Sequence, residues 1–300
     1  MAVAASVSAC EDPFGPVVDP EYSIDLRYWG DPPGEEQQAR IASAVARWEG
    51  LIMRGLPPAF VEGDAGCGVG APEMDEEVDD LVVFVRVIDI GALAESGPCL
   101  VRSDGGLPIT ATVWLDGPGR LSQLDPDFLE SLVTHELGHA LGFGTIWEDR
   151  ALLREPSLSG GAEPHFAGTN AIAAFNAAGG LGFDGKKVPV ETAGGHGTAD
   201  SHWSQMPFGN ELMTATVLPG PNPLSRVTAA SMIDLGYEID LEGSDDYVIP
   251  GADADVAPAR APAELPPLTE SAPRWPITAI DRRGAVVRRI RPGTSSTGSR

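Results

Sequence analysis

The sequence predicts an α+β fold that is divided into two lobes. Three strand patterns and two long helix patterns lie before residue 146, whereas the stretch after it is rich in glycine and has only two short helical patterns. A chain of 300 residues can bury a sizeable core, and none of its apolar runs approaches the roughly 18 residues of a membrane span. The sequence is therefore typical of a folded protein with no integral membrane span.

The first lobe, expected over 21–146, begins with a strand, a helix and two further strands. Apolar and polar residues alternate over 22–28, which predicts a strand, and a Pro-Pro-Gly break follows it. Apolar residues recur at helical spacing over 41–52, and glutamates precede them, so a helix is expected there. Two more strands are expected at 81–88 and 110–115, with a loop between them.

A second long helix is predicted over 126–143. Asp125 suits the N-cap and Pro126 the first helical position, because the first N–H groups of a helix have no partner within it. The apolar residues of this segment form two adjacent stripes, and a pair of glycines ends the pattern. Beyond it, only 170–178 and 225–235 have helical patterns, so most of the second half is expected to be irregular.

Charge and composition distinguish the two lobes from the ends of the chain. Acidic residues outnumber basic ones by 44 to 20, which leaves no basic surface for phosphates, so nucleic acid is not an expected partner. The second lobe is expected over 147–248. Residues 249–300 contain Ala/Pro repeats and an excess of arginine without apolar periodicity, which predicts a disordered tail. Residues 1–20 are expected to be a leader or linker that includes part of an export signal.

The segment His135-Glu136-Leu137-Gly138-His139 is an HExxH motif on the second long helix. Residues four apart share one face of a helix, so both imidazoles can reach one ion while Glu136 lies beside them. A catalytic zinc site normally takes three protein ligands, so a third must come from elsewhere. In the contiguous pattern HExxHxxGxxH, Gly142 is in place, but Thr145 stands where the last histidine would be.

The residues leave two kinds of third ligand open, a later glutamate or one of the other histidines. The glutamate candidates are Glu148, Glu155, Glu163 and Glu191. Among the histidines, His165 is far from any other signal, and His196 lies in a glycine-rich stretch that is poorly suited to holding a metal ligand in place. His202 is favoured, because Trp203 follows it and Met213 lies eleven residues further on.

The sequence also resembles a known family. The run 135–143, an insertion of about sixty residues, then 201–203 (Ser-His-Trp) and 211–214 (Glu-Leu-Met-Thr) resemble the leishmanolysin family of metzincin zinc endopeptidases, in particular its bacterial members. Further segments with this resemblance are 24–28, 46–49, 79–85 and 188–191. The resemblance therefore covers roughly residues 22–240.

The resemblance implies a metzincin-type zincin fold: a first lobe with a twisted sheet and two long helices, one of them the active-site helix, and an irregular second lobe with a Met-turn. It implies one Zn²⁺ per chain, held by His135, His139 and His202, with Glu136 as the general base. Met213 would be the Met-turn methionine, and Gly142 would have a structural role. The implied activity is endopeptidase cleavage of protein or peptide substrates by a monomer. The alternative is a non-catalytic zinc-binding adhesion or interaction module, although such a module has no need of a base.

The cysteines bear on the compartment. Cys67 and Cys99 lie in predicted loops on either side of the strand at 81–88, so a disulfide between them is geometrically feasible and would indicate an oxidising compartment. Cys10 ends a Val-Ser-Ala-Cys run that resembles a bacterial lipoprotein cleavage box, although no positive charge precedes it. A lipid anchor and an ordinary thiol both stay open for Cys10. The expected location is extracytoplasmic, as a secreted protein or cell-surface lipoprotein of a bacterium.

Overall fold

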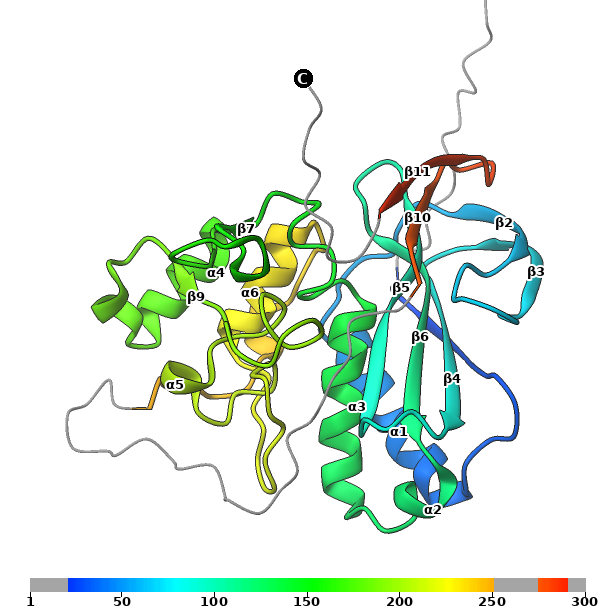
Figure 1. Ribbon diagram of the computed structural model, residues 1–300, viewed down its shortest axis with the longest axis horizontal. Helices are drawn as coiled ribbons and strands as arrows, with labels where there is room; N and C mark the ends of the chain where they lie inside the picture. The colour runs from blue at the N-terminus through cyan, green and yellow to red at the C-terminus, as the bar shows by residue number, and fades with distance from the viewer. Residues whose placement is uncertain (1–20, 251–274, 291–300) are drawn as a thin grey trace, which may run out of the picture.

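A six-stranded mixed sheet is the framework on which one half of the molecule is built (Figure 1). The computed structural model describes residues 21–250 and 275–290. In spatial order the strands are β1 (Ile24–Tyr28), β4 (Leu81–Ile88), β6 (Pro108–Asp116), β5 (Ala94–Arg102), β10 (Ile277–Ile280) and β11 (Val286–Ile290). β1, β4 and β6 are parallel, β5 runs antiparallel to β6, and β10 runs parallel to β5. The predicted α+β class is confirmed.

Two long helices cover one face of this sheet, α1 (Glu35–Glu49) and α3 (Pro126–Ala140) (Figure 1). The apolar stripe of α1 buries Ile41, Val45 and Trp48, as its spacing predicts. The Trp48 indole also donates a hydrogen bond of 2.8 Å to the carbonyl of Thr134 in α3. The two helices and the inner face of the sheet therefore form one apolar core.

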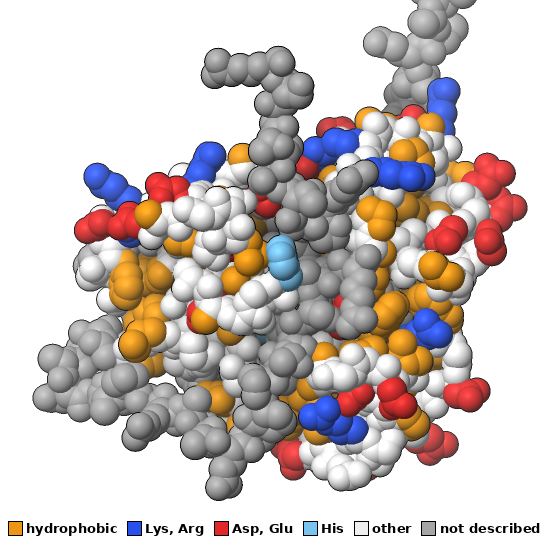
Figure 2. Space-filling model, viewed as in Figure 1, with side chains coloured by type: hydrophobic (Ala, Val, Ile, Leu, Met, Phe, Trp, Pro, Cys, Tyr) orange, Lys and Arg blue, Asp and Glu red, His pale blue; other side chains and the backbone are white. Residues whose placement is uncertain are grey.

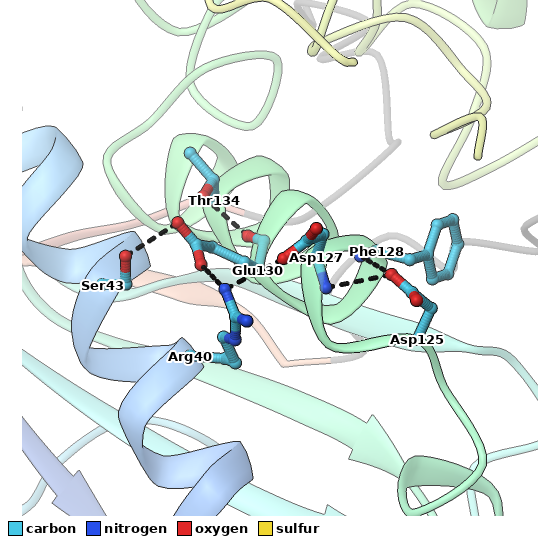
Figure 3. Close-up of polar contacts among 7 residues, drawn as sticks. All are labelled: Arg40, Ser43, Asp125, Asp127, Phe128, Glu130 and Thr134. Carbon is cyan, nitrogen blue, oxygen red and sulfur yellow. Dashed lines mark hydrogen bonds and ion pairs between the residues drawn. The ribbon is translucent and has the colours of Figure 1, made fainter. Parts of the chain in front are cut away.

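The start of α3 is fixed by hydrogen bonds (Figure 3). The Asp125 carboxylate accepts the backbone N–H groups of Asp127 and Phe128 at 3.0 and 3.1 Å, which confirms the predicted N-cap. One turn later, the Glu130 carboxylate accepts Arg40 and Ser43 of α1 at 2.9 and 2.7 Å (Figure 3). Partial burial acts to raise the pKa of Glu130, but the hydrogen bonds from α1 outweigh it and lower that pKa.

The other face of the sheet is partly covered by a hairpin of β2 (Ala59–Asp64) and β3 (Glu73–Val78). Acidic side chains gather over this hairpin on the face shown in Figure 2. A disulfide joins Cys67, between the two strands, to Cys99, so the predicted pairing is confirmed. Both cysteines are fully buried, and the bond ties the hairpin to the sheet.

The second half of the molecule consists mostly of loops with short elements (Figure 1). Its helices are α4 (Thr169–Ala177), α5 (Gln205–Phe208) and α6 (Arg226–Leu235), with 3₁₀ turns at Ser157–Ser159, Gly180–Phe183 and Leu241–Gly243. A small sheet joins β7 (Leu153–Arg154), β8 (His165–Phe166) and β9 (Val188–Pro189). The remaining short helix, α2 (Pro118–Leu121), belongs to the first half of the molecule and precedes α3. Buried aromatic rings pack between these elements: Trp203 stacks on Phe208 and meets Phe143 edge to face and Trp147 at a tilt.

One expectation about β-structure is wrong, and one hairpin was not predicted. The segment around Cys99 is a strand, β5, and not a loop; the Gly-Pro pair at 97–98 disguises it, because proline is tolerated only at an edge or an irregularity of a sheet. The pairing register of β5 with β6 does shift next to Pro98, as this rule requires. The hairpin β2–β3 was also not expected, because β3 is largely acidic and buries only two of its side chains.

The expectation of a disordered tail over 249–300 is wrong for residues 275–290. These residues form β10 and β11, which extend the sheet beside β5. The Trp275 indole donates to the Pro98 carbonyl at 3.1 Å, and Arg288 forms a bidentate ion pair with Asp149. Residues 1–20, including Cys10, and residues 251–274 and 291–300 lie outside the described residues. Within the described ranges, none of the helices combines the length and the hydropathy that a membrane span needs.

Candidate metal centre

Helix α3 presents the two histidines of the HExxH motif on one face, one turn apart. His135 is fully buried and His139 is 5% exposed, and their rings meet edge to face with centroids 4.7 Å apart. This face of α3 is turned toward the second half of the chain, since the His135 ring contacts the backbone of Leu212. The helix thus supplies two imidazoles to the boundary between the two halves.

Two glycines after α3 have positive φ angles, and the second of them allows the chain that carries His202 to approach. Gly142 has a φ of +108°, and a Cβ there would lie 2.7 Å from the Ile146 side chain. At Gly144, with φ of +72°, a Cβ would lie 2.1 Å from the carbonyl oxygen of Ser201. The residue before His202 therefore packs directly on the turn that follows the helix.

His202 is held by neighbouring strands of extended backbone. Its carbonyl accepts the N–H of Glu191 at 2.9 Å, and the N–H of Trp203 donates to the carbonyl of Met213 at 3.0 Å. The Trp203 side chain is fully buried, and its indole donates to the Thr228 hydroxyl of α6 at 2.8 Å. These contacts fix the position of His202, a candidate ligand that lies 63 residues after His139 in sequence.

Three imidazole Nε2 atoms converge at this boundary. The Nε2 of His139 lies 3.0 Å from that of His135 and 2.9 Å from that of His202. The three residues form a cluster whose candidate ligand atoms all lie within 4.8 Å of one another. In a tetrahedral site with Zn–N bonds of about 2.05 Å, neighbouring ligand nitrogens lie about 3.3 Å apart. The cluster is therefore close to the size that a small metal ion requires.

The opposite ring nitrogens determine which tautomer faces the cluster. The Nδ1 atoms of His135, His139 and His202 lie 2.6, 2.9 and 2.9 Å from the carbonyl oxygens of Leu212, Phe143 and Thr198. A carbonyl only accepts hydrogen bonds, so each Nδ1 donates its N–H outward and leaves Nε2 as the ring nitrogen that faces the other two histidines. Three imidazole nitrogens at this spacing form the donor set of a shared metal ion. The donor set therefore fits a metal ion.

Glu136 follows His135 in α3 and is 1% exposed. Its backbone carbonyl accepts a hydrogen bond of 2.7 Å from the Ser96 hydroxyl of β5. Because Ser96 is itself buried, this bond ties α3 to the sheet at the position of Glu136. The residue is thus fixed next to the histidine cluster by both its helix and its sheet neighbour.

Met213 lies fully buried against the motif helix. A Cβ at Gly138 would lie 2.8 Å from both the sulfur and the methyl carbon of Met213, so the glycine gives this methionine room in its present position. The backbone N–H of Met213 donates to the carboxylate of Glu211 at 2.6 Å. Met213 therefore packs directly on the turn of α3 between the two histidines.

Glu211 organises the backbone around Met213. It is fully buried, and besides Met213 its carboxylate accepts the N–H and hydroxyl of Ser225 at 3.2 and 2.7 Å and the hydroxyl of Thr228 at 2.5 Å. Burial raises the pKa of Glu211, although these hydrogen bonds act to lower it. Since Thr228 also accepts the Trp203 indole, one buried network links Met213 to the segment of His202.

The other candidate ligands lie elsewhere. Among residues 21–250 and 275–290, the cluster contains none of the four glutamates considered above and neither of the other two histidines. Glu191 accepts backbone N–H groups of Thr192 and Ala193, and Glu163 pairs with Lys187. His196 is exposed, and His165 lies in β8 with its ring near the Glu163 carbonyl. The structure thus brings together the three histidines that the resemblance implies.

Several residues that shape this site were not expected from the sequence: Ser96, Gly138, Gly144 and Glu211. Glu211 was noted only within the segment 211–214 that carries the family resemblance, and no local signal marks it as buried, because glutamate side chains are mostly exposed. No local signal existed for Ser96 and Gly144, since their roles depend on which distant segments meet.

Comparison with known proteins adds a family to this geometry. The family profile described as leishmanolysin, Peptidase M8, matches residues 74–245, which include the whole histidine cluster. The leishmanolysin of Leishmania major is 30% identical over 163 residues, which are 53% of this chain and 26% of that protein. The matched region therefore spans about a quarter of the length of this relative.

Proposed function

The chain belongs to the leishmanolysin family, and from that premise we propose that it is a zinc-dependent endopeptidase, with His135, His139 and His202 as metal ligands and Glu136 as general base. The observation that carries the proposal is the convergence of three imidazole Nε2 atoms, two of them from the helix that also carries Glu136. Three histidines that leave a fourth position for water are typical of catalytic zinc sites, whereas structural sites use four protein ligands.

When bound, zinc would polarise the scissile carbonyl and make a water molecule acidic at neutral pH. The chain's own contribution is to place a base beside that water. Glu136 would take the proton on its carboxylate and later deliver it to the amine of the departing peptide. The Ser96 hydroxyl bonds the backbone carbonyl of Glu136, which fixes the main chain from which this carboxylate projects.

A role for Met213 as the Met-turn residue is part of this proposal. Its support is the contact with Gly138 and the hydrogen bond to Glu211, which together make the floor of the cluster rigid. A tyrosine hydroxyl near the metal could stabilise the oxyanion that develops in the transition state. The next tyrosine after Met213 is Tyr237, which is 3% exposed and already donates its hydroxyl to the Leu141 carbonyl at 2.9 Å. Stabilisation of the developing oxyanion would therefore come from the metal and backbone N–H groups.

We also propose that the protein acts outside the cytoplasm. The disulfide between Cys67 and Cys99 supports this, because such bonds persist in oxidising compartments and are rare in the cytosol. Either secretion or a lipid anchor at Cys10 would place the protein in such an oxidising compartment.

The activity is tested by digesting a diverse peptide mixture and reading the products by mass spectrometry. The proposal expects internal cleavage that a zinc chelator abolishes and that added Zn²⁺ restores. Cleavage that persists in the chelated, metal-free protein would contradict it.

The ligand set is tested by counting zinc in variants. His202→Ala is expected to reduce zinc from one per chain to well below one, whereas the matched variants His196→Ala and His165→Ala retain it. Loss of zinc in His196→Ala with retention in His202→Ala would overturn the assignment.

A further inference from the structure

Asp200, two residues before His202, is a buried carboxylate with two backbone partners. It is 6% exposed, and its Oδ1 and Oδ2 atoms accept the N–H groups of Ser157 and Leu158, each at 2.9 Å. Both N–H groups belong to the 3₁₀ turn Ser157–Ser159, and N–H groups at the start of a turn have no partner within it. The Asp200 side chain therefore ties the loop after β7 to the segment that carries His202.

The backbone of Asp200 has a φ of +67°, a region that residues other than glycine rarely adopt. Among the described residues, the other non-glycine residues with a positive φ are exposed, namely Ala151, Glu155 and Asp184. Asp200 thus combines a buried carboxylate with a left-handed backbone, and each of these is unfavourable unless the surrounding structure compensates for it. Contacts on both sides of the residue must therefore hold this conformation.

The turn that contains Asp200 also aligns the His202 ring. The N–H of Asp200 donates to the carbonyl of Glu191 at 2.8 Å, and the N–H of Glu191 donates to the carbonyl of His202 at 2.9 Å. Two residues before Asp200, the carbonyl of Thr198 lies 2.9 Å from the Nδ1 atom of His202. Because Asp200 lies between Thr198 and His202 in the chain, a change in its backbone would displace both the ring and the carbonyl that orients it.

We propose that Asp200 is a positioning residue for the metal centre. Its carboxylate holds the turn 198–202 in the conformation that directs the Nε2 atom of His202 at the other two histidines. Asp200 does not belong to the histidine cluster, so it acts through the backbone and the Thr198 carbonyl. The inference rests on the proposed zinc-binding function, and it adds the residue on which the geometry of the third ligand depends.

The chain offers a matched control in Asp234 of α6. Its Oδ1 and Oδ2 atoms accept the N–H groups of Asn170 and Ala171 at 3.0 and 2.9 Å, at the start of α4. Like Asp200, this carboxylate therefore gives one oxygen to each of two consecutive N–H groups. No hydrogen bond or ion pair joins Asp234 to the histidine cluster, so Asp234→Ala removes the same kind of contact at a distance from the metal centre.

The zinc dissociation constants of the full-length wild type, Asp200→Ala and Asp234→Ala are measured by competition with a chelator. Loss of a partner that orients a metal ligand typically weakens metal binding by about 10–100-fold, so we expect at least about tenfold weaker binding in Asp200→Ala and no more than about twofold in Asp234→Ala. The visible absorption of the Co²⁺-substituted proteins, which depends on coordination geometry, is expected to change in Asp200→Ala alone. The Tm values of the metal-free variants are expected to fall by similar amounts, so lost stability would not explain the difference.

Two further variants separate the carboxylate from the backbone. Asp200→Asn keeps one acceptor oxygen and tolerates a left-handed backbone, so it is expected to bind zinc more tightly than Asp200→Ala. Asp200→Gly suits that backbone but has no acceptor, and it is expected to bind zinc as weakly as Asp200→Ala. These two variants also serve if Asp200→Ala does not fold.

Wild-type zinc affinity in Asp200→Ala or Asp200→Gly would overturn the proposal, and so would equal losses of affinity in Asp200→Ala and Asp234→Ala. A wild type that binds no zinc would instead contradict the proposed function. The two failures are therefore distinguishable.

Discussion

The disulfide that ties the outer hairpin to the sheet makes a quantitative prediction about stability. Cys67 and Cys99 are separated by 32 residues, and the chain-entropy relation for a loop of that length gives a stabilisation of about 3.7 kcal/mol at 25 °C. The double variant Cys67→Ala/Cys99→Ala is therefore expected to lose about that much free energy of unfolding. For domains of this size, each kcal/mol corresponds to about 2–4 °C in Tm, so the variant should melt roughly 7–15 °C below the wild type.

The assay is thermal unfolding of the wild type and the variant, followed by circular dichroism at the same protein concentration. Because the disulfide lies on the sheet face opposite α3, the zinc content of the variant is expected to remain one per chain. Cys10→Ser is the matched control and should leave Tm unchanged. A double variant that melts within about 2 °C of the wild type would contradict this prediction, since closing the loop would then contribute almost no stability.

Three further substitutions test the contacts that build the site. Gly144→Ala places a Cβ 2.1 Å from the Ser201 carbonyl oxygen at a φ of +72°, so we expect the His202 segment to be displaced. Zinc binding, measured in a competition assay, is expected to weaken at least tenfold. An unchanged zinc affinity would show that the close approach of Gly144 and Ser201 does not position His202. Glu211→Gln replaces an acceptor oxygen by an amide donor, although all the groups around it are donors. We therefore expect the free energy of unfolding, measured in urea, to fall by about 2–4 kcal/mol. A fall below about 0.5 kcal/mol would argue against the Glu211 network. Asp125→Ala removes the acceptor of two N–H groups of α3 and should lower the free energy of unfolding by about 1 kcal/mol, or Tm by about 2–4 °C. Its zinc content is expected to equal that of the wild type. A large loss of zinc would mean that the start of α3 is coupled to the metal site.

The elements that could be predicted from the sequence are those whose own periodicity decides their structure. The apolar spacing of α1 and the cap of α3 act within one segment, and the apolar strand β4 is buried between its neighbours β1 and β6. β5 could not be predicted, because its Gly-Pro pair is tolerated only through the irregular register with β6. The strand β10 was missed for a related reason, since its four residues become a strand only beside the edge of β5.

The site residues also divide into those that local spacing reveals and those that depend on distant contacts. His135, Glu136 and His139 follow from one motif on one helix, which local spacing alone reveals. His202 was favoured from its context and from the family resemblance, and the structure brings its ring to the other two. The fit of Met213 against Gly138 could not be predicted, because it depends on the contact between a helix and a turn 75 residues apart.

The proposed mechanism requires Glu136 to act as the base beside a metal that the three histidines hold. The most direct test measures zinc content and peptide cleavage on the same preparation of Glu136→Gln, with wild type in parallel. We predict about one zinc per chain in both proteins and cleavage in the wild type alone, because the substitution removes the proton acceptor and leaves the ligands in place. Cleavage by Glu136→Gln at the wild-type rate would contradict the mechanism, and zinc binding without cleavage in the wild type would favour a non-catalytic binding module.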